Sequence, residues 1–196
     1  MKNNIGEKYD KIAEWWHQYH HDSDYGIKQI ERAISYCTKR KTALDVGCGS
    51  GGRIIRKLEI NGFKVTGIDV SSKMIELAKD NHVSTKFILA DISTWETKKK
   101  YDLIVAWDSI FHLPLSMHSK VISKLCGMLQ KNGILAYTLG DDHGEHESDW
   151  HNEKFYYSTI GIKGNLKVIM ESNCEVRHLE LDQFPEKHVF VIAKKM

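Results

Sequence analysis

Residues 42–52 read TALDVGCGSGG, and this stretch decides the fold of the chain. A short apolar run contains one acid, Asp45, and is followed by a dense set of glycines. Ile54, Ile55 and Leu58 then recur at helical spacing, so the pattern predicts a strand, a tight turn and a helix. Glycine suits such a turn because a side chain would keep the backbone away from a bound ligand. A carboxylate two residues before the first glycine would not help to bind phosphate at the helix N-terminus, so the stretch favours a cationic ligand without phosphate.

The length and composition are those of an ordinary globular protein. The chain has 196 residues, of which 41% are hydrophobic and 28% charged, and its formal net charge is +2. This size predicts one domain, and the charge gives no global basic field for nucleic acid. No apolar run is long enough to span a bilayer, and the four cysteines show no paired metal spacing. We therefore expect a cytoplasmic protein with no membrane partner.

Predicted strands and helices alternate after residue 41. Strands are expected over residues 43–46, 64–69, 86–90, 102–107 and 134–139, and helices over 52–61, from Ser71 or Ser72 onward, over 116–130 and over 166–173. Residues 174–182 and 187–193 read as a β-hairpin across Pro185. The alternation predicts a Rossmann-like α/β three-layer sandwich, with a mostly parallel sheet covered on both sides. We place an N-terminal helical cap over residues 1–40 and a single compact core over residues 41–196.

Acidic residues lie at the ends of two of the predicted strands. Ligands of open α/β sheets bind at the carboxyl ends of the strands, where Asp69 can accept hydrogen bonds from two ribose hydroxyls. Val70 can then pack on an adenine, and Asp91 and Ile92 offer it a carboxylate and an apolar plate. The alternatives are a solvated loop aspartate for Asp69 and a helix cap for Asp91.

In this order, the motifs resemble those of the class I S-adenosylmethionine-dependent methyltransferases over roughly residues 42–194. Residues 44–51 resemble motif I, 67–71 motif II, 89–92 motif III, 101–107 motif IV and 129–135 the segment that follows them. The resemblance implies a seven-stranded sheet and S-adenosyl-L-methionine as cofactor. It implies cofactor contacts at Asp45, Gly47, Gly49, Gly51, Asp69, Val70, Met74, Asp91, Ile92 and the backbone of Trp107.

A dinucleotide-binding fold is the competing interpretation of the glycine loop. Gly47, Gly49 and Gly52 also satisfy the dinucleotide fingerprint, and Asp69 lies near the expected ribose position. Asp45 and the C-terminal hairpin weigh against this interpretation.

The loop after the fourth strand indicates the class of methyl acceptor. Residues 107–114 read WDSIFHLP, which lacks the aspartate-proline-proline-aromatic motif used on planar amines. The form is similar to small-molecule methyltransferases of the ubiquinone-biosynthesis type. His112 is our first candidate for a general base and His143 the second, since imidazole titrates near neutral pH. The alternative for His112 is a histidine that packs beside the cofactor and holds the loop.

Two further regions are rich in aromatic and histidine residues. Residues 141–151, DDHGEHESDWH, fit a lid over the acceptor, a metal site or a solvated loop. Trp15 and Trp16 point about 100° apart on a helix, so simple packing on the sheet does not explain both. Our candidate acceptor-binding residues are Trp15, Trp16, Tyr19, His143, His146, Trp150 and His151, and we assign no metal ligand.

We therefore predict a methyltransferase that acts on a small molecule by in-line displacement. Two alternatives stay open: a non-catalytic module that binds S-adenosylmethionine or a metal, and an RNA methyltransferase. The second is disfavoured because the chain has no basic tail or added recognition domain. The acceptor and the oligomeric state are left undetermined by the sequence.

Overall fold

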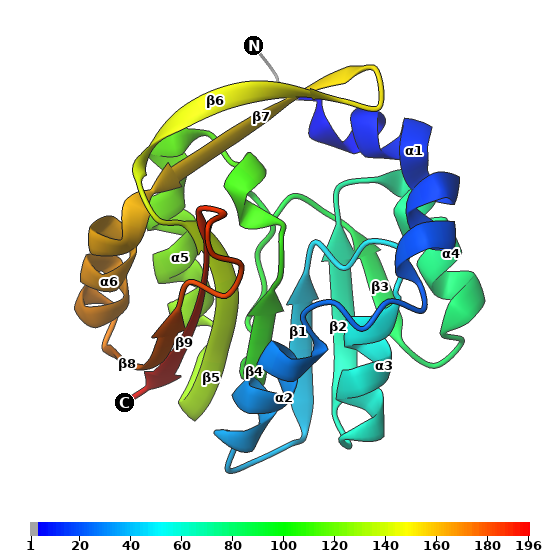
Figure 1. The fold of residues 1–196 in the computed structure, drawn as a ribbon. Coiled ribbons are helices and arrows are strands. Elements are labelled where there is room, and N and C mark those ends of the chain that lie inside the picture. The colour runs from blue at the N-terminus through cyan, green and yellow to red at the C-terminus, as the bar shows by residue number, and fades with distance from the viewer. Residues whose placement is uncertain (1–3) are drawn as a thin grey trace.

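The computed structural model describes residues 4–196 and contains one large sheet with helices on both faces (Figure 1). The large sheet has the order β3-β2-β1-β4-β5-β9-β8. Its strands are β1 (Thr42–Val46), β2 (Lys64–Asp69), β3 (Lys86–Leu89), β4 (Tyr101–Ala106), β5 (Leu129–Gly140), β8 (Cys174–Glu180) and β9 (His188–Lys195). The helices are α1 (Ile5–His20), α2 (Ile27–Ser35), α3 (Arg53–Ile60), α4 (Ser72–Asn81), α5 (His118–Gly127) and α6 (Gly161–Glu171), with short 3₁₀ turns at Ile110–His112 and Leu115–Met117.

The strand pairing confirms the predicted seven-stranded sheet. β1 pairs in parallel with β2 and β4, β2 with β3 and β4 with β5, whereas β9 is antiparallel to β5 and β8. The order therefore reverses beside β1, and a crevice is expected at the carboxyl ends of β1 and β4.

Two buried clusters cover the two faces of the sheet. β4 is buried along its whole length: Ile104 belongs to the cluster beneath α5 and α6, and Leu103 and Val105 to the one beneath α2 and α3. Such a strand lies inside a three-layer sandwich and reads as a continuous apolar run. α2 also packs in the second cluster, through Ile30 and Ile34.

The predicted cap region holds two helices with different positions. α1 lies over the carboxyl edge of the sheet, where Asp10 accepts hydrogen bonds from the Ser71 hydroxyl (2.6 Å) and the Lys73 amide (3.0 Å). α2 covers a face of the sheet instead. The division of the chain at residue 40 stays a prediction.

The histidine-rich segment is a β-hairpin and not a loop. β6 (His143–Trp150) pairs antiparallel with β7 (Glu153–Ile160) and runs across the carboxyl edge of the large sheet toward α1 (Figure 1). Its turn places His151 and Asn152 at positive φ, 50° and 60°. The sequence hid this hairpin because β6 has no buried side chain, so it lacks apolar alternation, and the turn lacks the usual Asn-Gly or Asp-Gly pair.

Two helix boundaries also differ from the prediction. The helix expected over residues 116–130 ends at Gly127, because β5 already begins at Leu129. The last helix begins at Gly161 and not at residue 166.

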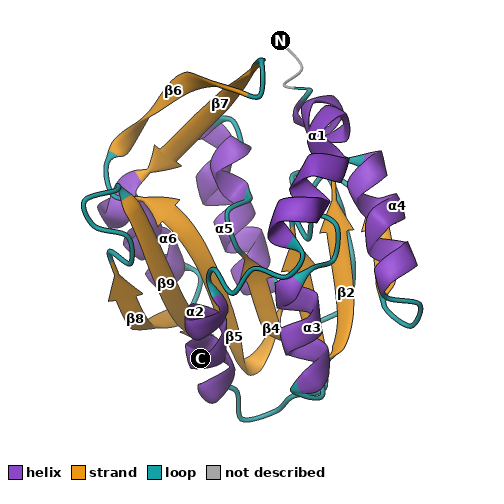
Figure 2. Cartoon of the chain, turned by 45° about the vertical axis from the view of Figure 1, so that its right-hand side comes forward, coloured by secondary structure: helices purple, strands orange, loops and turns teal. Residues whose placement is uncertain are grey.

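Figure 2 shows α1 and the hairpin above the same edge of the sheet. Within residues 4–196, no helix has the length and hydropathy needed to traverse a bilayer.

Candidate functional site

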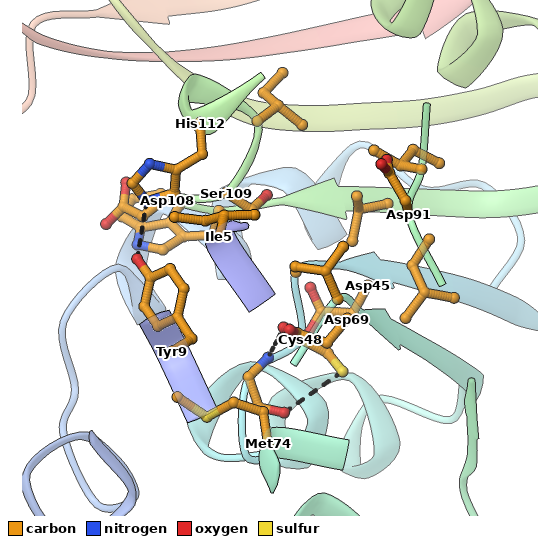
Figure 3. A pocket seen from close by; sticks show the side chains of 18 of the residues that line it. Ile5, Tyr9, Asp45, Cys48, Asp69, Met74, Asp91, Asp108, Ser109 and His112 are labelled. Carbon is orange, nitrogen blue, oxygen red and sulfur yellow. Dashed lines mark hydrogen bonds between the residues drawn. The ribbon is translucent and has the colours of Figure 1, made fainter. Parts of the chain in front are cut away.

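A cavity of about 990 Å³ lies at the carboxyl edge of the sheet, beneath α1. The ends of β1, β2 and β4 form its floor, and α1 and the 3₁₀ turn Ile110–His112 contribute the upper walls (Figure 3). The cavity therefore occupies the crevice that the strand order predicts.

The glycine loop after β1 forms one wall of the cavity. Gly47 and Gly49 have φ of +71° and +53° and line the cavity. A Cβ at Gly47 would lie 2.2 Å from Ser109 Cβ, so a side chain cannot be placed there without moving the loop after β4. The missing side chain at Gly47 therefore lets the loop after β4 pack directly on the glycine loop.

Gly51 has a different role in the same loop. A Cβ there would lie 3.0 Å from Ala78 Cβ on α4, and the Gly51 carbonyl accepts a hydrogen bond from His82. Gly51 does not line the cavity, so its part in cofactor binding, expected from the motif, is at most indirect.

Two aspartates lie on the floor, Asp45 buried and Asp69 partly buried. Asp69 accepts hydrogen bonds from the amides of Gly49 (2.8 Å) and Ser71 (2.9 Å), which fix its carboxylate beside the glycine loop. Burial, together with the charge of Asp69, raises the pKa of Asp45 to about 7. A cation bound nearby would restore the charged form of Asp45.

Arg53 supplies a positive charge at the same end of the cavity. Its Nε donates to the carbonyl of Tyr25 (2.6 Å) and its Nη1 to the carbonyl of His20 (3.3 Å). Burial lowers the pKa of Arg53, while the charges of Asp108 and Asp45 act in the opposite direction. The cavity thus offers carboxylates and one guanidinium, which suits a ligand that carries an ammonium and a carboxylate.

Asp108, directly after Trp107, anchors a polar network. Its carboxylate contacts the Tyr25 hydroxyl (2.9 Å) and His188 Nε2 (2.8 Å), and Asp182 contacts His188 Nδ1 (2.5 Å). Both ring nitrogens of His188 therefore donate, which makes it an imidazolium. Burial alone would lower the pKa of His188, but the hydrogen bonds and charges of the two aspartates outweigh it and raise the pKa.

Ser109 has a buried hydroxyl with no hydrogen-bond partner among residues 4–196. The residue lines the cavity and faces Gly47. Buried polar groups are normally satisfied, so this hydroxyl suits a bound ligand.

Tyr9 and His112 meet in the upper part of the cavity. His112 Nδ1 lies 2.8 Å from the carbonyl of Tyr156, so this nitrogen carries the proton and donates. Its Nε2 therefore accepts from the Tyr9 hydroxyl, 2.9 Å away (Figure 3). Burial lowers the pKa of His112 to about 4, and burial raises that of Tyr9, so both groups are neutral at pH 7.

Aromatic rings join α1 to the tip of the hairpin. Trp150 lies 6.5 Å from Tyr9, 5.6 Å from Trp15 and 6.0 Å from Trp16, between ring centroids. Lys8 also donates to the carbonyl of Lys154. We use the name aromatic clasp for the six rings Tyr9, Trp15, Trp16, Trp150, His151 and Phe155.

The structure gathers most predicted cofactor residues and disperses the predicted acceptor residues. The cofactor candidates that line the cavity are Asp45, Gly47, Gly49, Asp69, Val70, Met74, Asp91, Ile92 and Trp107. Of the other candidates, His112 and Trp16 line it. Trp15, Trp150 and His151 belong to the aromatic clasp, Tyr19 is 62% exposed, and His143 and His146 lie exposed on β6, away from the lining residues.

Several lining residues were not predicted: Ile5, Tyr9, Tyr25, Arg53, Asp108 and Ser109. Arg53 lies two residues after motif I and Asp108 directly follows motif IV, so their positions in the sequence could have indicated them. Tyr9 belongs to the aromatic N-terminal helix that the sequence singles out, but its place beside His112 follows only from the path of that segment. Tyr25 carries no sequence signal. No group of three or more metal-binding side chains comes together within residues 4–196.

The comparisons with known proteins agree with this geometry. Residues 43–133 match a family described as a methyltransferase domain. The chain is 31% identical to the ubiquinone biosynthesis O-methyltransferase of Rickettsia bellii, over 91% of this chain and 84% of that protein. Its fold is similar to magnesium protoporphyrin IX methyltransferase of Synechocystis with bound S-adenosylhomocysteine, at a TM-score of 0.75 and 15% identity, covering 98% of both chains. A methyltransferase from Clostridium acetobutylicum gives a TM-score of 0.74 at 15% identity, over 96% of this chain and 99% of that one.

A glycine-walled cavity with buried acids, at the switch point of this sheet, defines a class I methyltransferase site. The chain belongs to the S-adenosylmethionine-dependent methyltransferases of the small-molecule type. It is an enzyme whose cofactor is S-adenosylmethionine.

The residues present fit this cofactor. S-adenosylmethionine carries a sulfonium, an ammonium and a carboxylate and no phosphate, which matches Asp45, Asp69 and Arg53. Gly47 and Gly49 line the cavity, and the buried Ser109 hydroxyl, which has no hydrogen-bond partner among residues 4–196, can bind the cofactor.

Proposed function

We propose that this enzyme methylates a hydroxyl group of a small-molecule acceptor that binds between the cofactor and the Tyr9–His112 pair. The observation that carries the proposal is the hydrogen bond between Tyr9 and His112 inside a cavity whose opposite wall fits S-adenosylmethionine. The relative from Rickettsia bellii, an O-methyltransferase by name, supports oxygen as the methylated atom.

We assign the cofactor to the floor of the cavity. Asp69 holds the ribose hydroxyls, Val70 and Ile92 pack on the adenine, and Asp91 binds its amino group. Asp45 favours the cationic end of the cofactor and Arg53 its carboxylate. When bound, S-adenosylmethionine supplies a methyl group on an activated sulfonium, so the protein mainly has to align the two reactants.

Tyr9 and His112 provide a path for the acceptor proton. An acceptor hydroxyl that donates to the Tyr9 oxygen would be linked through the Tyr9 hydroxyl to His112 Nε2. The protonated His112 would then keep its hydrogen bond from Nδ1 to the Tyr156 carbonyl. His112 thus acts as the base through Tyr9, and His143 takes no part because it lies outside the cavity lining.

The aromatic clasp closes the site over the reactants. Because α1 and the hairpin tip meet through Trp150 and Phe155, their separation would open the cavity to solvent. A closed site excludes water from the transferring methyl group.

We also propose a cytoplasmic location for this enzyme.

The test is a screen of hydroxylated small molecules for release of S-adenosylhomocysteine by the purified enzyme. We expect turnover with at least one phenol or alcohol and none with the matched methyl ether. Turnover with amines alone would contradict the oxygen assignment. Replacement of Tyr9 by phenylalanine tests the role of the Tyr9–His112 pair separately.

A further inference from the structure

The edge of the sheet opposite the cavity collects basic residues from distant parts of the sequence. Residues 39–41 read KRK and residues 98–100 read KKK, and each run immediately precedes a strand, β1 or β4. The amino ends of parallel strands share one edge, so the two runs meet there. Lys64 and Lys86 begin β2 and β3 at the same edge.

These cations share one surface. Lys39, Lys41, Lys99, Lys100 and Lys131 line a hollow of about 470 Å³. Lys99 Nζ donates to Thr66 Oγ1 (3.3 Å) on β2, where Thr66 pairs with Lys86 and lies two residues after Lys64. Burial and the charges of Lys64 and Lys86 lower the pKa of Lys99. We call the whole surface the basic edge; it comprises Lys39, Arg40, Lys41, Lys64, Lys86, Lys98, Lys99, Lys100 and Lys131.

The charges of the basic edge are not neutralised by the protein. All of its side chains are exposed, and among residues 4–196 none of them forms an ion pair with a carboxylate. The carboxylate in the hollow, Asp102, accepts from the backbone amides of Lys41 and Thr42. Because the whole chain has a formal charge of only +2, the remainder of the molecule is net negative. This separation of charge produces a local positive potential at the basic edge, although the net charge of the whole chain is close to zero.

Two exposed aliphatic side chains lie at the same end of the sheet as these cations. Ile60, at the end of α3, is 80% exposed, and Val83, between α4 and β3, is 97% exposed. Ile60 precedes the turn into β2, which begins at Lys64, and Val83 lies in the turn into β3, which begins at Lys86. Both lysines belong to the basic edge. Phe63, Phe87 and Tyr101, which lie at this end, are buried and offer no platform for stacking bases.

We propose that the basic edge docks the enzyme on an anionic lipid bilayer. Lysine ammonium groups interact with anionic headgroups as point charges, and exposed aliphatic side chains enter the interface beside them. A nucleic-acid surface would be expected to contain more arginine for bidentate phosphate contacts, and this edge has one, Arg40. The cavity lies at the opposite edge of the sheet and would face the aqueous phase. The proposal departs from our expectation of no membrane partner, which was based on the absence of a spanning segment. It is independent of the proposed acceptor.

The test is co-sedimentation of the full chain with vesicles of phosphatidylcholine, with and without phosphatidylglycerol. We expect binding to the anionic vesicles only, weakened by raising the salt concentration. The variant K39Q/K41Q/K98Q/K100Q should weaken binding by at least about tenfold. The matched control K28Q/K120Q/K163Q/K167Q removes the same charge from other exposed positions and should bind like the wild type.

A second variant tests the aliphatic contribution. I60S/V83S keeps every charge, and because both side chains are exposed it should fold normally; we expect weaker vesicle binding. Equal losses in the basic-edge variant and its control would overturn the proposal, as would the absence of binding to anionic vesicles. Tighter binding to an RNA homopolymer than to vesicles would also overturn it and assign the edge to nucleic acid. Methyl transfer in solution should be unchanged in all these variants, which separates this proposal from the proposed function.

Discussion

The Tyr9 hydroxyl on α1 donates to His112 Nε2 across 2.9 Å, and the other ring nitrogen of His112 is held by the Tyr156 carbonyl on β7. One imidazole therefore connects the N-terminal helix, the loop after β4 and the hairpin. This connection holds the candidate base together with α1 and the β6–β7 hairpin, on the side of the cavity opposite the proposed cofactor site.

Removal of the Tyr9 hydroxyl tests the proton path. In Y9F the ring and its packing are kept, but the acceptor proton has no route to His112. We expect kcat to fall by about 100-fold, the lower range for general-base catalysis, with little change in KM for S-adenosylmethionine. Y19F, an exposed tyrosine on the same helix, is the matched control and should retain full activity. An unchanged kcat in Y9F would rule out the proposed path.

His112 should make the fold sensitive to acid. Its pKa in the folded protein is about 4, compared with an ordinary value of 6.5, so the unfolded chain binds a proton more readily. The stability contributed by neutral His112 is present above pH 6.5 and is lost as the pH falls toward 4, by up to about 3 kcal/mol.

The measurement is the free energy of unfolding from denaturant titrations at about pH 4.5 and about pH 7, which cover most of the range in which His112 titrates. The wild type should lose more stability on acidification than H112Q, which has no titrating group at this position. Equal losses in the two proteins would show that burial does not depress the pKa of His112.

Cofactor binding should be linked to the ionisation of Asp45. The pKa of this buried carboxyl is about 7 in the cofactor-free protein, and the positive charge of S-adenosylmethionine should lower it. Binding should then release protons near pH 6, and the affinity should rise with pH up to about 7 and level off above it. Calorimetric titration in buffers of different ionisation enthalpy measures the released protons. D45N should release fewer protons, and the prediction fails if the wild type and D45N release the same number.

The aromatic clasp should control opening of the site. W150A removes the ring that contacts Tyr9, Trp15 and Trp16, so dissociation of S-adenosylmethionine should be faster by up to about 100-fold, at about 1 kcal/mol for each of the aromatic pairs. H146A, on the same hairpin but stacked on Tyr157, is the control and should dissociate like the wild type. Stopped-flow measurement of cofactor release distinguishes the two variants. Release from W150A at the wild-type rate would show that the clasp does not gate the cavity.

The sequence predicted the parts of the molecule that local patterns encode. The glycine loop, the apolar strand β4 and the acids at the strand ends carry their own signals, so the sheet and most of the cofactor-lining residues followed from them. The hairpin β6–β7 did not, because its outer strand is polar and its turn depends on positive φ at His151 and Asn152.

The acceptor side depended on tertiary placement that no short motif records. Tyr9 reaches His112 only because α1 crosses the carboxyl edge, where Asp10 is fixed to Ser71 at the start of α4. In the same way, the basic edge brings together two lysine-rich runs that are far apart in the sequence. Spacing along the chain therefore predicted the floor of the site and missed its cover.

The central claim, that this cavity holds S-adenosylmethionine through Asp69, is tested most directly by calorimetric titration of the cofactor into the wild type and D69N. The substituted amide keeps the size of the side chain and one acceptor for the Gly49 or Ser71 backbone N–H, and thermal melts confirm that the variant folds. D24N, at an exposed aspartate outside the cavity lining, is the control. We predict one binding site in the wild type and in D24N, with affinity reduced by at least about tenfold in D69N because the charged acceptor for the ribose hydroxyls is lost. Equal affinity in D69N and the wild type would contradict the account.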